Sequence, residues 1–123
     1  MARILLIDDD EQFRMLLRKM LEKAGYNDIE EANDGSMGVK LFRQHPFDLV
    51  ITDLIMPDKE GIETIIELTG ENPQIKIIAM SGGGRVGPQD YLETAKRLGA
   101  SRTLAKPFNY SELVDTVHEL LSE

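Results

Sequence analysis

Cysteine and long apolar runs are both absent from this chain of 123 residues. Without cysteine there are no disulfides, no thiolate metal ligands and no thiol nucleophile. No apolar run approaches the roughly 20 residues that a membrane-spanning helix needs. The apolar stretch Ile4–Ile7 near the N-terminus is far too short for a signal peptide. We therefore expect a soluble, cytoplasmic protein that does not act at a membrane.

Positive charge is also scarce. Lys and Arg number 14 against 22 Asp and Glu, so the formal net charge is 14 − 22 = −8. An acidic surface repels nucleic-acid phosphates, and we expect no direct nucleic-acid partner. The remaining composition, 41% hydrophobic and 29% charged, is that of an ordinary globular domain. We expect residues 1–123 to form a single domain, since the chain shows no linker, repeat or low-complexity stretch.

Two kinds of segment alternate along the chain. Short runs typical of β-strands occur at Ile4–Ile7, Asn27–Ala32, Leu49–Ile51, Ile75–Met80 and Ser101–Ala105. Between them, apolar residues spaced by three and four predict amphipathic helices. These residues are Phe13, Leu16, Leu17, Met20 and Leu21; Ile62, Ile65 and Ile66; Tyr91, Leu92, Ala95 and Leu98; and Leu113, Val114, Val117, Leu120 and Leu121.

A further helix is expected near Gly35 to Gln44, although Gly38 interrupts its pattern. Gly25 and Gly99 follow helical stretches, as C-terminal caps do. The alternation predicts an α/β fold of the (βα)5 type, in which a doubly wound sheet of five parallel strands carries helices on both faces. The partly polar run Asn27–Ala32 is expected at an edge of that sheet.

Polar residues follow four of the five predicted strands. They are the run Asp8 to Asp10, then Asp53, Ser81 and Lys106. Ligands bind beyond the carboxyl ends of the strands in an open parallel sheet. We therefore expect carboxylates, a hydroxyl and an ammonium to converge at one edge of the sheet.

The carboxylates indicate a metal site. Asp8, Asp9 and Asp53 would repel one another unless a cation neutralised them. A hard divalent ion such as Mg²⁺ accepts oxygen ligands of this kind. The alternative is helix capping, in which an acidic side chain accepts hydrogen bonds from free backbone N–H groups. We favour the cap for Asp10 and the metal for Asp8 and Asp9.

A carboxylate beside a metal can attack phosphorus and form an acyl phosphate, and Asp53 is placed for this reaction. Lys106 would add positive charge for the phosphoryl oxygens, and Ser81 would donate a hydrogen bond to one of them. Each residue also has an ordinary interpretation: Asp53 as a loop cap, Lys106 as a surface lysine and Ser81 as a turn residue.

Gly82, Gly84 and Gly87 match the dinucleotide-binding pattern G-x-G-x-x-G. That pattern belongs after the first strand and is followed by an acid about 20 residues later, neither of which holds here. A Walker motif is also excluded, because Pro88 and Gln89 stand where Lys and Ser or Thr are needed. We interpret the segment as a loop.

Four motifs together resemble the receiver domains of two-component response regulators. They are Ile-Leu-Leu-Ile-Asp-Asp-Asp, Asp-Leu-Val-Ile-Thr-Asp-Leu-Ile-Met-Pro, Ile-Ile-Ala-Met-Ser-Gly and Leu-Ala-Lys-Pro-Phe. They occur in the family's order and spacing, and the resemblance extends from Ala2 to Ser122. It implies a flavodoxin-like fold with strand order 2-1-3-4-5.

The resemblance also implies a role for each site residue. Asp53 corresponds to the phosphoacceptor. Asp8 and Asp9 correspond to the acidic pair that holds Mg²⁺, with Asp9 as the direct ligand and Asp8 acting through water. Together with Asp53, the backbone carbonyl of Ile55 would complete the ligands from the protein.

Ser81 corresponds to the switch hydroxyl of the family. Lys106 corresponds to the lysine of the active site, with a cis bond to Pro107. Thr103 stands where many receivers carry an aromatic switch residue, and this departure argues against a rotating-ring mechanism.

The resemblance implies a sensor histidine kinase or phosphotransfer protein as phosphodonor, and a downstream protein target that meets the fourth and fifth helices and fifth strand. Because the chain ends at Glu123, we expect no effector module. It would then be either a receiver that stands alone or a domain cut from a longer protein.

Two alternatives to a phosphoacceptor receiver remain. A small phosphohydrolase would use the same aspartyl phosphate, but its Asp-x-Asp-x-Thr pattern is half met, with Gln12 at the threonine position. It would be an enzyme that turns over external substrates, whereas a receiver only phosphorylates itself and slowly loses the phosphoryl group. A pseudo-receiver that binds partners without phosphorylation is weakened by the complete set of site residues.

Overall fold

The computed structural model describes residues 2–54, 61–81, 93 and 95–123. Its strands form one parallel sheet in the order β2-β1-β3-β4-β5. They are β1 (Arg3–Ile7), β2 (Asp28–Ala32), β3 (Leu49–Asp53), β4 (Lys76–Ser81) and β5 (Arg102–Ala105). Each strand begins and ends within two residues of its predicted bounds. The predicted fold class, strand order and edge position of β2 are confirmed.

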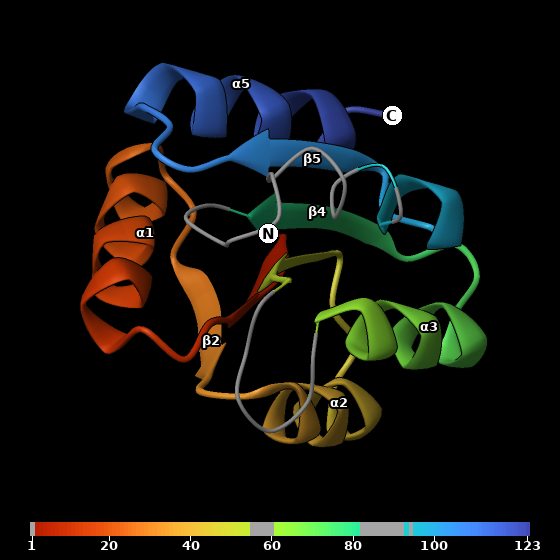
Figure 1. Ribbon diagram of the computed structural model, residues 1–123. Coiled ribbons are helices and arrows are strands. Elements are labelled where there is room, and N and C mark those ends of the chain that lie inside the picture. Colours follow the sequence, from red (N-terminus) through yellow and green to blue (C-terminus); the bar gives the residue numbers. More distant parts are fainter. Residues whose placement is uncertain (1, 55–60, 82–92, 94) are drawn as a thin grey trace.

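Helices cover both faces of this sheet (Figure 1). Helices α1 (Glu11–Lys23) and α5 (Tyr110–Leu121) lie on one face, and α2 (Gly35–Gln44) and α3 (Gly61–Glu71) lie on the other. The helix predicted around Tyr91 to Leu98 falls partly outside the described residues; within this range, the described residues 93 and 95–98 are helical. The apolar strands are therefore buried from both sides, as their unbroken hydrophobic runs predicted.

The helical stripes are narrower than predicted. Leu17 and Leu21 on α1 are fully buried, but Leu16 is 47% exposed; on α3, Ile65 is buried and Ile66 is 49% exposed. Adjacent residues on a helix differ by about 100° in direction, since one turn takes 3.6 residues. A helix that lies on a flat sheet buries one of the two neighbours and leaves the other at the margin.

Three glycines meet specific steric demands. Gly25 and Gly99 adopt φ values of +99° and +126°, which confirms them as caps that favour glycine. Gly38 lies inside α2, where a Cβ atom would stand 2.8 Å from Cγ1 of Ile7. The glycine that weakens the helical pattern of this segment thus allows α2 to approach β1 closely.

Candidate functional site

The loop after β1 places the first two acidic residues. Asp8 is fully buried, and its backbone N–H donates to the carbonyl of Ala32 at 3.1 Å. One carboxylate oxygen of Asp8 accepts from the backbone N–H of Asp10 at 2.9 Å. Asp10 is itself the N-cap of α1 and accepts from the N–H of Phe13 at 3.1 Å. The cap predicted for Asp10 is confirmed, while Asp9 is exposed.

The end of β3 places Asp53 beside this loop. Asp53 is the last residue of the strand and is 8% exposed. The chain just after it is held by a hydrogen bond from the N–H of Leu54 to the carbonyl of Met80 at 2.9 Å. The N–H of Gly61, at the start of α3, donates to the carbonyl of Leu54 at 3.0 Å. Strand β4 and helix α3 therefore both fix the backbone next to Asp53.

Lys106 brings the cation to the cluster from the end of β5. Its Nζ atom lies 3.1 Å from Oδ2 of Asp8 and 3.6 Å from Oδ2 of Asp53. Its backbone N–H donates to the carbonyl of Ser81 at 2.8 Å. The bond to Pro107 is cis, in agreement with the expectation. The ammonium thus bridges residues from two other strand ends.

The three carboxylates fit a hard divalent cation. Asp8, Asp9 and Asp53 each offer an oxygen, and these oxygens lie within 4.8 Å of one another. Burial raises the pKa of Asp8, while the amide of Asp10 and the nearby Lys106 act in the opposite direction. A bound Mg²⁺ would offset the negative charge that is costly to bury, and it would take the closely spaced carboxylate oxygens as ligands. Ile55, whose carbonyl was predicted as a further ligand, lies outside the described residues.

Ser81 is the last residue of β4, whereas the sequence predicted it directly after that strand. It is 1% exposed, and its Oγ atom has no hydrogen-bond partner among the described residues. Burying a hydroxyl without a partner is costly, and a hydrogen-bond acceptor bound at this edge would remove that cost. Thr103 lies half-buried in β5, in register with Ala79 of β4. The segment Gly82 to Gly87, which the sequence predicts to be a loop, lies outside the described residues.

Sequence reasoning missed two residues that contact the site. Phe13 was assigned to the apolar stripe, but its ring lies 4.0 Å from Nζ of Lys106. Arg14 donates to the backbone carbonyl of Asp8 at 2.7 Å and forms a 2.7 Å ion pair with Glu31. The sequence pattern that could have identified Phe13 and Arg14 is their position in the first turn of a helix that starts next to the acidic residues.

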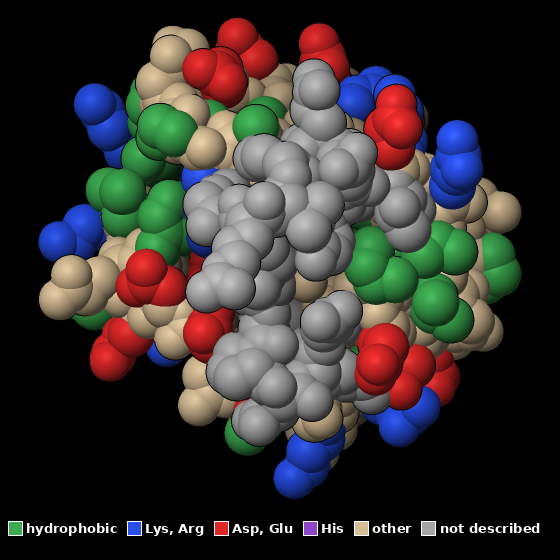
Figure 2. Space-filling view, in the orientation of Figure 1, with side chains coloured by type: hydrophobic (Ala, Val, Ile, Leu, Met, Phe, Trp, Pro, Cys, Tyr) green, Lys and Arg blue, Asp and Glu red, His purple; other side chains and the backbone are tan. Residues whose placement is uncertain are grey.

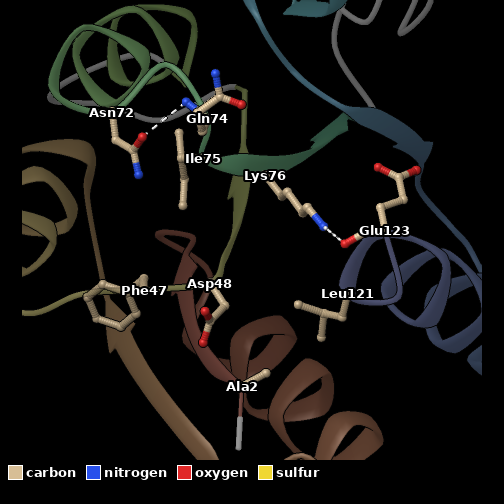
Figure 3. A pocket seen from close by; sticks show the side chains of 9 residues that line it. All are labelled: Ala2, Phe47, Asp48, Asn72, Gln74, Ile75, Lys76, Leu121 and Glu123. Atoms are coloured by element: carbon tan, nitrogen blue, oxygen red, sulfur yellow. Dashed lines mark hydrogen bonds between the residues drawn. The ribbon is translucent and has the colours of Figure 1, made fainter.

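A cavity of about 530 Å³ lies at the opposite edge of the sheet, among the ends of β1, β3, β4 and α5. Figure 3 shows its lining, in which Lys76 reaches the carbonyl of Glu123 at 3.3 Å. Asn72 accepts from the N–H of Gln74 at 3.0 Å, and Asp48 accepts from the N–H of Arg3 at 2.8 Å. The polar groups of this cavity thus form hydrogen bonds within the loops at the amino ends of the strands. The cavity is separate from the acidic cluster.

On the face shown in Figure 2, the described residues mix both signs of charge, and hydrophobic side chains gather near α1 and α3. The exposed residues on these helices include Met15 and Leu16 of α1 and Ile66 of α3. Among the described residues, no helix is both long and apolar enough to cross a membrane.

Comparison with known proteins agrees with this geometry. The sequence model of the response regulator receiver domain matches residues 4–118. The response regulator receiver protein CpdR of Brucella abortus is 33% identical over 121 residues, which cover 98% of each chain. The chemotaxis protein CheY of Bacillus subtilis is 31% identical over 120 residues, again 98% of each.

Solved structures show the same fold. A response regulator receiver domain protein from Clostridium thermocellum superposes with a TM-score of 0.91 at 27% identity, covering 99% of this chain and 95% of that one. A CheY-like receiver domain protein from Methanospirillum hungatei gives 0.90 at 27% identity, covering 99% and 94%. These relatives are signalling modules, so the comparisons give the phosphohydrolase alternative no support.

Proposed function

The chain belongs to the response regulator receiver domain family, and we propose that it accepts a phosphoryl group on Asp53. The family implies signalling by phosphorylation, and receiver domains bind Mg²⁺ at an acidic pocket such as the one formed here by Asp8, Asp9 and Asp53. The observation that carries the assignment to Asp53 is the position of Lys106. Its ammonium lies 3.6 Å from Asp53 and 3.1 Å from Asp8, at the edge where the five parallel strands end.

In the proposed reaction, a carboxylate oxygen of Asp53 attacks the phosphorus of the donor and forms a new P–O bond. The bond from phosphorus to the donor's imidazole nitrogen breaks, and the electron pair leaves with that nitrogen, which takes up a proton. Lys106 offsets the negative charge on the phosphoryl oxygens. Ser81 donates its hydroxyl to one of these oxygens and so gains the partner that it lacks among the described residues.

Mg²⁺, when held by Asp8, Asp9, Asp53 and the carbonyl of Ile55, supplies further positive charge for the same oxygens. The buried Asp8 also orients the cluster, because it accepts from the amide of Asp10 and from Lys106.

A sensor histidine kinase or a phosphotransfer protein would supply the phosphoryl group in the cytoplasm. A downstream protein would bind the face formed by β5, α5 and the helix before β5, and its affinity would depend on phosphorylation. We propose residues 1–123 as one receiver domain with no nucleic-acid or membrane partner of its own. Transfer of a phosphoryl group to its own Asp53, from a protein or a small donor, and slow dephosphorylation are its only proposed reactions.

The test uses acetyl phosphate as donor in the presence of Mg²⁺, with intact-protein mass as the readout. We expect one added phosphoryl group on the wild type, none on Asp53→Asn and one on the matched control Asp115→Asn. Asp115 is an exposed residue of α5. A phosphoryl group that persists on Asp53→Asn would show that another residue is the acceptor.

A further inference from the structure

We propose that Phe13 is a positioning residue for phosphoryl transfer, because the face of its ring holds the Lys106 ammonium against Asp8 and Asp53. This inference rests on the proposed function, in which Lys106 stabilises the phosphoryl oxygens. It adds a component that the acidic cluster and the strand-end residues do not contain: an aromatic surface from the first turn of α1.

The ammonium is enclosed from two sides. Oxygens of Asp8 and Asp53 lie 3.1 and 3.6 Å from Nζ, and the centroid of the Phe13 ring lies 4.0 Å from it. A lysine ammonium within about 6 Å of a ring centroid is attracted by the negative charge density of the ring face. The Lys106 side chain is 20% exposed, so water screens this attraction only in part.

The ring is itself held in place. Phe108 meets it edge to face, with ring centroids 5.7 Å apart and an interplanar angle of 89°. Both rings pack against the core cluster beneath α1 and α5. The backbone N–H of Phe13 also donates to the Asp10 side chain that caps α1. The ring therefore has a fixed orientation, determined by the loop that carries the acidic pair and by the segment after Lys106.

A fixed ring matters because lysine is flexible. Its ammonium sits on a four-carbon chain and loses rotamer entropy when it is confined to one place. Charge that is already in position when the phosphoryl group arrives costs no reorganisation during the reaction. An aliphatic residue at position 13 would exclude water but would not attract the cation. The proposed role of Phe13 therefore depends on the charge distribution of its ring and not on the volume of the side chain alone.

The first experiment compares Phe13→Leu and Phe13→Tyr with the wild type, using acetyl phosphate so that no protein donor touches α1. We expect the maximal phosphorylation rate of Phe13→Leu to fall about three- to tenfold, and Phe13→Tyr to restore it. The Mg²⁺ concentration for half-maximal rate should stay unchanged, because the carboxylates are intact. Phe42→Leu is the matched control, since Phe42 is also half-buried but packs against the other core cluster; its rate should equal the wild type.

A second experiment keeps the shape of the ring. Site-specific incorporation of phenylalanine with one, two and three ring fluorines at position 13 weakens the negative face stepwise while changing the volume little. We expect the logarithm of the phosphorylation rate to fall with each fluorine. This series stays informative even if Phe13→Leu does not fold.

The outcomes separate this inference from the proposed function. A rate indifferent to fluorination, or Phe13→Leu and Phe42→Leu with equal rates, overturns the role of Phe13. If the rate is insensitive to the Phe13 changes while Lys106→Ala is slow in the same assay and Asp53→Asn stays unlabelled, the inference fails and the proposed function stands. An unlabelled wild type, or label on Asp53→Asn, overturns both.

Discussion

Asp8 carries its carboxylate into the interior, and burial raises its pKa. The amide of Asp10 and the ammonium of Lys106 offset the cost of that charge in part. In the unfolded chain Asp8 is hydrated and far from Asp53, so the cluster costs stability only in the native state. The metal-free protein is therefore expected to carry an electrostatic penalty at this residue.

Replacing Asp8 by Asn removes the charge and keeps the volume. Without Mg²⁺ we expect the free energy of unfolding to rise by about 1 kcal/mol. Mg²⁺ at ten times its Kd should stabilise the wild type by about 1.4 kcal/mol and Asp8→Asn very little. Urea denaturation of both proteins, with and without Mg²⁺ at constant ionic strength, gives the four values. Equal stabilisation of the two proteins by Mg²⁺ would mean that Asp8 takes no part in the metal site.

Gly61 and Gly70 offer a matched pair within α3. A Cβ atom at Gly61 would overlap the carbonyl oxygen of Asp53 and lie 2.5 Å from Cα of Leu54, whereas nothing lies within 4 Å at Gly70. We expect Gly61→Ala to lower the free energy of unfolding by about 1–3 kcal/mol and to slow phosphorylation by shifting Asp53. Gly70→Ala should stabilise the protein by about 0.5–1 kcal/mol. Thermal melts and the acetyl phosphate assay test both variants, and a tolerated alanine at position 61 would contradict the close packing.

At the scale of elements, an ion-pair network joins α1 to the edge strand β2. Glu31 of β2 accepts from Arg14 at 2.7 Å and from Arg18 at 2.8 Å. Arg14 also donates to the backbone carbonyl of Asp8. The network therefore connects the edge of the sheet with the loop that carries the acidic pair.

The pH dependence of this network has a definite sign. Burial raises the pKa of Glu31, but hydrogen bonds from Arg14 and Arg18 outweigh it and hold the pKa below the usual 4.5. A carboxylate with a lowered pKa stabilises the folded state above its unfolded pKa, and the gain is lost as pH falls through the folded value. We expect Glu31→Gln to cost about 1–2 kcal/mol at neutral pH, and the difference from the wild type to vanish below the folded pKa.

Urea melts of the wild type and Glu31→Gln across acid and neutral pH measure that difference. Glu119→Gln is the control, because its contact with Arg102 is 3.8 Å long and Glu119 is 65% exposed. A gap between wild type and Glu31→Gln that stays constant at all pH values would contradict the assignment.

At the scale of the whole molecule, the acidic edge is linked to the outer strand through β4 and β5. Ser81 ends β4 and is in register with Ala105, and the carbonyl of Ser81 accepts from the N–H of Lys106. Thr103 lies two residues before Ala105 in β5. Its short side chain has little apolar area to bury or expose, so we expect a modest change at this strand on phosphorylation.

Ser81→Ala removes one neutral hydrogen bond, worth about 0.5–1.5 kcal/mol. We expect the variant to accept the phosphoryl group while the amide chemical-shift changes around Thr103 become smaller than in the wild type. NMR spectra with and without the phosphoryl group measure this, with Ser122→Ala at the far end of α5 as control. Undiminished changes in phosphorylated Ser81→Ala would show that its hydroxyl is not the link.

Local pattern was enough for most of the fold. Unbroken apolar runs predicted the strands, and the polar residue after each run identified Asp8, Asp53, Ser81 and Lys106 as neighbours at one edge, since parallel strands end there together. The strand order itself came from family resemblance, because periodicity carries no information on which strands pair. The stripe positions Leu16 and Ile66 were wrong, because periodicity does not tell how wide a face the sheet covers.

By itself, then, the sequence determined the fold class and the convergence of acid, hydroxyl and ammonium at the carboxyl edge. Only the tertiary structure decided the contacts between side chains. The Lys106–Asp8 pair joins residues 98 positions apart, and the contact of Phe13 with Lys106 spans nearly as far. Such contacts depend on how the end of β1 and the start of α1 lie relative to the end of β5. That placement follows from the packing of the core that these elements share, which no local pattern in the sequence predicts.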